Sequence, residues 1–232
     1  MIDPLTAAAA TTGLAFVGVA SASWHLRRRV RRVEAQAARL RRQLQAEYHA
    51  ANHDPLTGLP NRRGFFRRGE ALVADPNRHP LVAVVLDLDD FKLVNDRFGH
   101  AVGDRVLVTV ARRFADWAAY RTGPDDTGPV PGNLVGRLGG DEFAGLLSAS
   151  STDPDRLRHA AWRLTDLLAA PIPVGGHTVR VSVSAGMAGV PAASSLSDAL
   201  HHADAAMYRS KHGGRLETPA ERLTLTAASA SE

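Results

Sequence analysis

The chain of 232 residues contains no cysteine. Disulfide scaffolds, thiol nucleophiles and cysteine-ligated metal sites are therefore excluded. The length suits one domain of ordinary size with additional segments, and a core of that size needs neither disulfides nor structural zinc. Lysine is nearly as scarce, since only Lys92 and Lys211 accompany 26 arginines. A compact ammonium differs from a guanidinium, so the two lysines either mark places that need one or fall there by chance.

Positive charge is concentrated at one end of the chain. The net charge is +4, but residues 1–53 hold eight arginines and three acidic residues, and the rest of the chain sums to −1. The sequence pI of about 10.1 therefore reflects the N-terminal segment. A nucleic-acid-binding domain carries its positive charge on the folded body, so we expect no nucleic-acid partner.

Long hydrophobic runs are rare, and residues 4–24 form an alanine-rich stretch without charge. Its length matches the roughly 20 residues of a bilayer span. Five arginines follow it closely and none precedes it. By the positive-inside rule, residues 1–26 are predicted to be a single transmembrane helix of the inner membrane, with the body in the cytoplasm. The alternative is a disordered or interfacial alanine-rich arm.

A basic helix is predicted over residues 27–52. Its apolar side chains recur at alternating steps of three and four, at Val30, Val33, Ala37, Leu40 and Leu44. That spacing favours a short parallel coiled coil between two copies of the chain. It lasts only about two heptads, so a solvated amphipathic helix is the alternative.

The remaining pattern predicts a mixed α/β or α+β fold. Residues 52–61 are dense in turn formers and mark the start of a domain over residues 53–217. Strands are predicted over 81–86, 134–138, 143–147 and 179–190, and helices over 62–74, 103–120, 155–169 and 196–211. Strands that alternate with helices indicate a layered sandwich. Residues 218–232, rich in Ala, Ser and Thr, are predicted to be disordered.

An acidic cluster directly follows the apolar strand over residues 81–86. It contains Asp87, Asp89 and Asp90. Carboxylates packed so closely repel one another unless a cation relieves them, and Mg²⁺ prefers such oxygen ligands. The alternative is an exposed acidic turn that caps the next helix.

Two further acids, Asp141 and Glu142, follow the paired glycines Gly139 and Gly140. Paired glycines between two strands indicate a tight hairpin and allow a ligand to approach the backbone. A neighbouring strand would then bring these acids beside Asp87. The alternative is an ordinary turn with polar residues at its tip.

Five motifs together resemble those of the GGDEF diguanylate cyclase family. Residues 139–143 read GGDEF, and residues 54–62 read DPLTGLPNR, similar to the family's DxLTGLxNR. The other three are DLDDFKLVND at 87–96, GHAVGD at 99–104 and AMYRSKHGGR at 206–215. The resemblance covers about residues 53–216, in the family's order.

The resemblance implies a fold and a reaction. The fold would be a palm like that of adenylyl cyclases and polymerases, with a central, mostly antiparallel sheet flanked by helices and preceded by an N-terminal helix. The reaction would condense two GTP into cyclic di-GMP and two pyrophosphates across a homodimer. Two Mg²⁺ ions, or Mn²⁺, would serve each active site. A catalytically inactive receptor for GTP or a cyclic dinucleotide is the alternative, although no acid or glycine of the tip is missing.

The resemblance also assigns roles to single residues. The expected catalytic residues are Asp87, Asp141 and Glu142. The expected metal ligands are the same three carboxylates and the backbone carbonyl of Leu88. Guanine would be read by Asn95 and Asp104. Phosphates would be bound by the backbone amides of Phe91 and Lys92, by the space beside Gly139 and Gly140, and by Lys211 and Arg215.

Two features depart from the family pattern, the inhibitory motif and the residue after the closing Gly-Arg. The inhibitory RxxD motif of many members is replaced, with Val130 and Asn133 at its charged positions, so we predict no product inhibition there. Leu216 stands where Asn usually follows the closing Gly-Arg, which leaves open whether the last strand of the fold is present. Arg137 is expected to pair with a nearby acid, and Asp54 to shape the turn before the domain.

Overall fold

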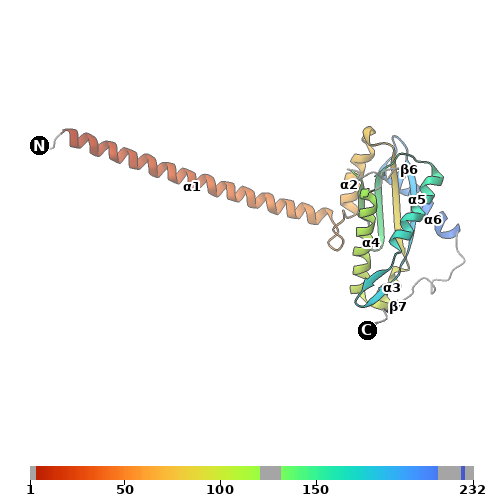
Figure 1. Cartoon of the computed structure of the whole chain (residues 1–232). Helices are drawn as coiled ribbons and strands as arrows, with labels where there is room; N and C mark the ends of the chain where they lie inside the picture. The colour runs from red at the N-terminus through yellow and green to blue at the C-terminus, as the bar shows by residue number, and fades with distance from the viewer. Residues whose placement is uncertain (1–3, 121–131, 214–225, 228–232) are drawn as a thin grey trace. The chain divides into compact units, whose positions relative to one another are not determined.

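The computed structural model describes residues 4–120, 132–213 and 226–227. The chain divides into two units, residues 1–49 and 50–232. The helices are α1 (Pro4–Asn52), α2 (Arg62–Val73), the 3-10 helix η1 (Pro76–Arg78), α3 (Phe91–Phe98), α4 (His100–Tyr120), α5 (Pro154–Leu168) and α6 (Leu196–Gly213) (Figure 1). The strands are β1 (Leu81–Asp89), β2 (Leu134–Arg137), β3 (Glu142–Ser148), β4 (Ile172–Val174), β5 (His177–Val179), β6 (Ser182–Val190) and β7 (Thr226–Ala227).

Helix α1 corrects one prediction. Across the ranges that the structure describes, no helix combines the length and apolar character needed to span a membrane. The prediction of a transmembrane helix over residues 1–26, and with it the inner-membrane location, is wrong. Length and absence of charge carried that prediction, but Ala, Ser, Thr and Gly make up most of the stretch and dilute its few large apolar side chains.

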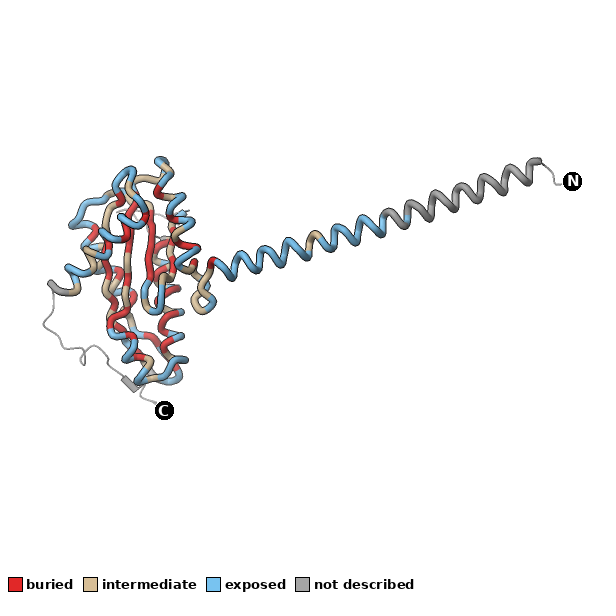
Figure 2. The backbone as a smooth tube through the Cα atoms, turned by 180° about the vertical axis from the view of Figure 1, so that it is seen from behind, coloured by how far each residue is buried: buried red, intermediate tan, exposed pale blue. Residues whose placement is uncertain are grey.

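The second half of α1 leaves its apolar seam uncovered within a single chain. Val30, Val33, Leu40 and Leu44 are all exposed large hydrophobic residues. Figure 2 shows α1 almost uniformly exposed over the part whose burial is described. Such a stripe of large apolar side chains is what a helical partner would cover. The coiled coil itself stays a prediction.

The central sheet has the strand order β2-β3-β1-β6, and every neighbouring pair is antiparallel. Strand β1 lies between β3 and β6, and side chains of helices pack on both of its faces, so its sequence is almost continuously apolar. It runs three residues further than the predicted 81–86, because β6 continues to pair with it as far as Asp89. The predicted class, a mostly antiparallel sheet flanked by helices, is confirmed.

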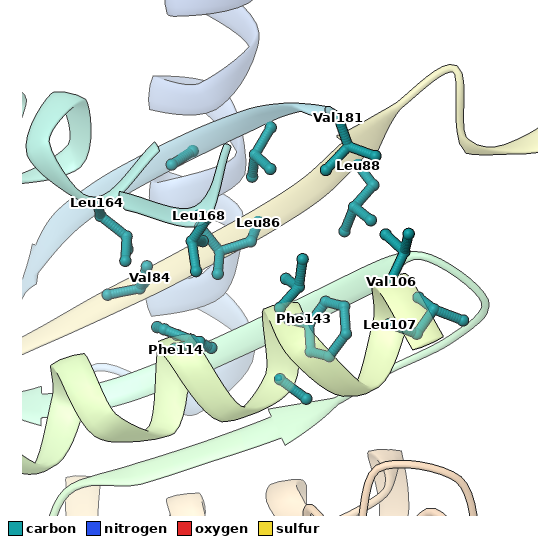
Figure 3. Close-up of a cluster of buried hydrophobic side chains, with 14 of the residues drawn as sticks. Val84, Leu86, Leu88, Val106, Leu107, Phe114, Phe143, Leu164, Leu168 and Val181 are labelled. Atoms are coloured by element: carbon teal, nitrogen blue, oxygen red, sulfur yellow. The ribbon is translucent and has the colours of Figure 1, made fainter. Parts of the chain in front are cut away.

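Side-chain alternation along β1 divides the core in two. Val84, Leu86 and Leu88 point to one face, where they pack in a cluster with residues of α4 and α5. Figure 3 shows this cluster, with Phe114 of α4 and Phe143 of β3 among its labelled members. Ala83 points to the other face, in a second cluster with residues of α2 and α6. By the same alternation, Asp87 and Asp89 lie on the α2 and α6 face.

A second, smaller sheet has the order β4-β5-β7. The predicted strand over 179–190 is in fact two strands, β5 and β6, and the β4–β5 turn has Gly175 and Gly176 at positive φ. Strand β7 pairs with β5, and it lies within the tail that was predicted to be disordered. The other residues of that tail, and Leu216, lie outside the described residues.

Candidate active site

The strand register brings two of the predicted acids together. Asp87 of β1 lies directly opposite Glu142, the first residue of β3. Residues opposed in this way have Cβ atoms about 5 Å apart and share one face of the sheet. The turn between β2 and β3 closes with a hydrogen bond from the Leu138 amide to the Glu142 carbonyl (2.9 Å). The structure therefore places the hairpin acids beside Asp87, at one end of the α2 and α6 face.

The two glycines of the hairpin tip are exposed. Neither has a positive φ, so the turn conformation does not itself demand glycine. A Cβ at Gly140 would meet no heavy atom within 4 Å, and one at Gly139 would meet only the Glu142 Oε2, at 3.3 Å. What the pair provides is an uncovered stretch of backbone that a phosphate group can approach closely.

Lys211 of α6 is bound to the acidic cluster. Its Nζ donates to Asp87 Oδ2 at 3.0 Å and lies 2.9 Å from Asp89 Oδ1. Partial burial alone would lower the pKa of Lys211, but its hydrogen bonds and charge interactions with Asp89 and Asp87 raise it overall. Lys211 is therefore a charged ammonium held at the edge of the site.

The surroundings of Asp141 disfavour the charged form of its side chain. Partial burial is the main cause that raises the pKa of its carboxyl, and the negative charge of Asp87 adds to it. The charges of Lys211 and Arg137 oppose this without cancelling it. Its backbone carbonyl accepts a hydrogen bond from the Leu88 amide (3.3 Å), which places the Leu88 backbone against the hairpin tip. A bound cation would relieve this carboxyl–carboxylate repulsion.

Arg137 holds the hairpin tip through hydrogen bonds to its backbone. Its Nε and Nη2 both donate to the Gly140 carbonyl, at 3.0 and 2.7 Å, and its Nη1 donates to Asp54 Oδ1 at 2.9 Å. Asp54 also accepts from the amide and hydroxyl of Thr57. The expected pairing of Arg137 with a nearby acid, and the turn around Asp54, are both present.

The start of α3 supplies the predicted phosphate-binding amides. Asp90 precedes the helix in the left-handed region (φ 53°) and turns the chain from β1 directly into α3. The first N–H groups of a helix have no intrahelical acceptor, so the amides of Phe91 and Lys92 are available to an anion. The Phe91 side chain is buried in the core, and Lys92 is exposed.

The two residues predicted to read guanine lie on facing helices. Asn95 of α3 packs against Gly103 of α4, where an added Cβ would lie 1.9 Å from the Asn95 Oδ1. Asp104 follows Gly103 directly and is exposed. Gly99, at φ 82°, makes the bend that sets the two helices against each other. The structure thus places Asn95 next to the α4 turn that carries Asp104.

Two predicted positions lie outside the described residues, namely Arg215 and Val130. Asn133 is described and has a structural role, since its Nδ2 donates to the Ala118 carbonyl (2.6 Å) and its Oδ1 accepts from the Ser148 amide (2.8 Å). Sequence reasoning missed Ser184, whose hydroxyl donates to Asp89 Oδ1 at 2.8 Å. No motif marked this serine, because it lies in an ordinary alternating strand.

The residues fit an oxygen-bound divalent cation. In the portion of the chain that the structure covers, no group of three or more His, Asp or Glu side chains is gathered as a complete metal site. Mg²⁺, however, commonly binds one or two carboxylates and completes its shell with substrate phosphates and water. Asp87 and the opposed Glu142 supply two such carboxylates. The position beside Asp87 already accommodates one positive charge, the Lys211 ammonium.

An antiparallel sheet that ends in carboxylates, open glycines and a helix N-terminus defines a domain suited to a phosphate-bearing ligand. The family model described as "Diguanylate cyclase, GGDEF domain" matches residues 51–217. The chain belongs to the GGDEF diguanylate cyclase family.

Curated relatives are similar over most of this chain. Diguanylate cyclase TpbB of Pseudomonas aeruginosa is 39% identical over 187 residues, which is 79% of this chain and 40% of TpbB. An uncharacterized protein of Mycobacterium tuberculosis is 35% identical over 225 residues, or 91% of this chain and 33% of that protein. The chain thus spans well under half the length of these relatives.

Solved structures give the same result. The coiled coil and GGDEF domain of DgcB from Caulobacter crescentus, in complex with c-di-GMP, has a TM-score of 0.67 and 28% identity, covering 82% of this chain and 96% of that one. Diguanylate cyclase SiaD of P. aeruginosa, in complex with its activator SiaC, has a TM-score of 0.58 and 30% identity, covering 91% and 78%.

Proposed function

We propose that this chain is an active diguanylate cyclase, which condenses two GTP into cyclic di-GMP with release of two pyrophosphates. The observation that carries the proposal is the register pair of Asp87 and Glu142 beside the open glycine tip. Membership of the family and the cyclic dinucleotide in the DgcB structure support it.

The acidic edge would hold two Mg²⁺ ions, or Mn²⁺. The proposed ligands are the carboxylates of Asp87, Asp141 and Glu142 and the backbone carbonyl of Leu88. When bound, the ions neutralise the triphosphate and lower the pKa of the attacking hydroxyl. Gly139 and Gly140 leave room for the α-phosphate, because among the described residues only the Glu142 side chain comes near a Cβ placed at either position.

The other residues would bind the two ends of the nucleotide. The Phe91 and Lys92 amides, with the Lys211 and Arg215 side chains, suit the outer phosphates. Asp104, with Asn95, would read guanine, since a carboxylate accepts from the guanine N1–H and N2–H₂ groups. Adenine has no such donor pair on that edge, so an unpaired acceptor would reject it.

Each condensation step forms one bond and breaks one. The 3′-hydroxyl oxygen of one GTP attacks the α-phosphorus of the other, the hydroxyl proton is released, and pyrophosphate leaves. A second, reciprocal step closes the ring. Since each domain holds one GTP, two domains must face each other. The exposed seam of α1, which includes Leu40 and Leu44, is the surface that we propose pairs the two chains.

The dimer has its own test. Leu40→Glu places charge in the seam, whereas Gln45→Glu adds the same group at a b position, away from the seam, and serves as the matched control. We expect Leu40→Glu to lower the rate per chain at dilute protein and to recover part of it at higher concentration. Equal rates for both variants at every concentration would contradict pairing through the seam.

The function is tested on the purified full chain with GTP and Mg²⁺. Chromatography should show cyclic di-GMP and pyrophosphate, and ATP in place of GTP should give no cyclic product. A chain that is folded and binds GTP, yet yields no product, would contradict the proposal. That result would favour the alternative, a receptor for GTP or a cyclic dinucleotide.

A further inference from the structure

Asp89 is a charged residue for which the proposed reaction has no role. Within the described ranges it is the one charged residue that is buried, and its side chain is 6% exposed. Burying a carboxylate costs free energy unless partners satisfy it. The groups that contact Asp89 must therefore compensate for the burial of its charge.

Those partners are Ser184 and Lys211. The Ser184 hydroxyl donates to Asp89 Oδ1 at 2.8 Å, and the Lys211 ammonium lies 2.9 Å from the same oxygen. Ser184 is the register partner of Asp87 on β6, so it projects on the same face of the sheet. Partial burial alone would raise the pKa of Asp89, but hydrogen bonds from Lys211, Ser184 and Ser182 and the Lys211 charge lower it overall. By its contacts with Ser184 and Lys211, Asp89 joins β6 and α6 at one carboxylate oxygen.

The two aspartates that contact Lys211 differ in access. The Asp87 side chain is 26% exposed, so it is open to ligands, whereas Asp89 is nearly covered. Asp87 is also the carboxylate that the proposed function gives to the metal. A divalent cation there would compete with and repel the ammonium. Asp89 would then be the contact that keeps Lys211 at the site.

We propose that Asp89 is a positioning residue, which acts with Ser184 to hold the Lys211 ammonium where it meets the phosphates of GTP. An ammonium has three donors, and Asp89 occupies one of them. The others remain available once Asp87 has another partner. This inference rests on the proposed function for the identity of the ligand.

The test uses full-chain variants and three measurements. They are stability to urea without nucleotide, binding of a non-hydrolysable GTP analogue, and kcat and KM for GTP. We expect Asp89→Asn to weaken analogue binding and raise KM by about 10- to 100-fold, as for other residues that support a ligand-binding group. The effect on kcat should be smaller. Asp166→Asn removes an exposed carboxylate on α5 and should change none of these.

Serine 184 gives a milder pair of variants. Ser184→Ala removes only the hydroxyl and should weaken analogue binding in the same direction as Asp89→Asn. Ser184→Thr keeps the hydroxyl and should restore binding. This pair carries the test if Asp89→Asn does not fold. Equal analogue binding by the two Ser184 variants would overturn the proposal.

A double-mutant cycle separates positioning from a purely structural role. If Asp89 acts through Lys211, Asp89→Asn should weaken analogue binding little further in a Lys211→Ala background. If Asp89→Asn weakens analogue binding by the same factor in the parent and in the Lys211→Ala background, the proposal is overturned. An Asp89→Asn variant that differs from the parent only in needing more Mg²⁺ would also overturn it. Because analogue binding needs no turnover, the cycle can be read even if the parent makes no cyclic di-GMP.

Discussion

Asp54 and Arg137 lie 83 residues apart in the sequence and form an ion pair, with 2.9 Å between Oδ1 and Nη1. Both side chains are mostly buried, at 17% and 14% exposure. The same guanidinium holds the Gly140 carbonyl through two hydrogen bonds. The pair therefore ties the turn at the start of the domain to the tip of the candidate active site.

Arg137→Ala should lower cyclase activity while the domain stays folded. The Gly140 carbonyl would lose both donors, so the tip would be held less firmly, and we expect an effect of about 10- to 100-fold. Arg137→Lys should not restore activity, because an ammonium lacks the planar fork that makes the two contacts. Steady-state rates measure both. Arg158→Ala, which removes an exposed ion pair with Asp155, is the matched control.

The stability contributed by Asp54 should depend on pH. Partial burial alone would raise the pKa of Asp54, but hydrogen bonds from Thr57 and Arg137 and the Arg137 charge lower it overall. The unfolded chain thus binds this proton more readily. The contribution is therefore complete above the ordinary pKa of 3.8 and is lost as pH falls through the lower folded value.

Urea unfolding of the parent and of Asp54→Asn measures this contribution. At pH 7 the variant should be less stable by about 1 to 3 kcal/mol, the range for hydrogen bonds to charged groups. The difference should shrink at pH 3 and below. A difference that is the same at pH 7 and in acid would contradict the assignment.

Gly103→Ala should weaken GTP binding more than it weakens the fold. The new Cβ would lie 1.9 Å from the Asn95 Oδ1, the movable end of a side chain, so Asn95 would rotate away from its proposed guanine contact. We expect KM for GTP to rise by about tenfold, since one lost hydrogen bond in a specific site is of that order. Gly69→Ala is the control. Its new Cβ would lie 2.7 Å from Leu196 Cδ2, in the contact between α2 and α6, so the variant should lower stability without changing KM.

Product should not inhibit the enzyme through the RxxD position. Asn133 there bridges the Ala118 carbonyl and the Ser148 amide and offers no carboxylate. Initial rates should be unchanged by added cyclic di-GMP, except for competition at the active site. Asn133→Asp would place an oxygen against the Ala118 carbonyl and should cost about 1 to 3 kcal/mol of stability. Non-competitive inhibition of the parent by product would contradict this prediction.

The fold follows from local patterns to a large extent. The apolar run of β1, the glycine pair between β2 and β3, and the periodic apolar residues of α4 were each visible in the sequence. The proximity of Asp87 and Glu142 could also be predicted, because acids at a strand end and at a hairpin tip come together when the two strands pair. The register itself could not be derived, since it depends on how both faces of the sheet are filled.

Other features depend on the folded chain. Ser184 and Lys211 meet at Asp89 only because the Ser184 side chain projects from β6 on the sheet face that α6 covers, and no spacing along the sequence expresses that. The prediction for the N-terminal stretch was wrong for a different reason. Its lack of charge suggested a membrane span, but a span also requires a high mean hydropathy, which small residues do not supply.

The most direct test of the site compares the parent with Glu142→Gln for turnover and for GTP binding in the same preparation. Glu142→Gln keeps the shape of the residue opposite Asp87 but removes its charge, which the proposed metal binding requires. We predict that the parent forms cyclic di-GMP and that Glu142→Gln forms none, although both remain folded. Cyclic di-GMP formed at the same rate by Glu142→Gln would contradict the assignment of the acidic edge as the active site.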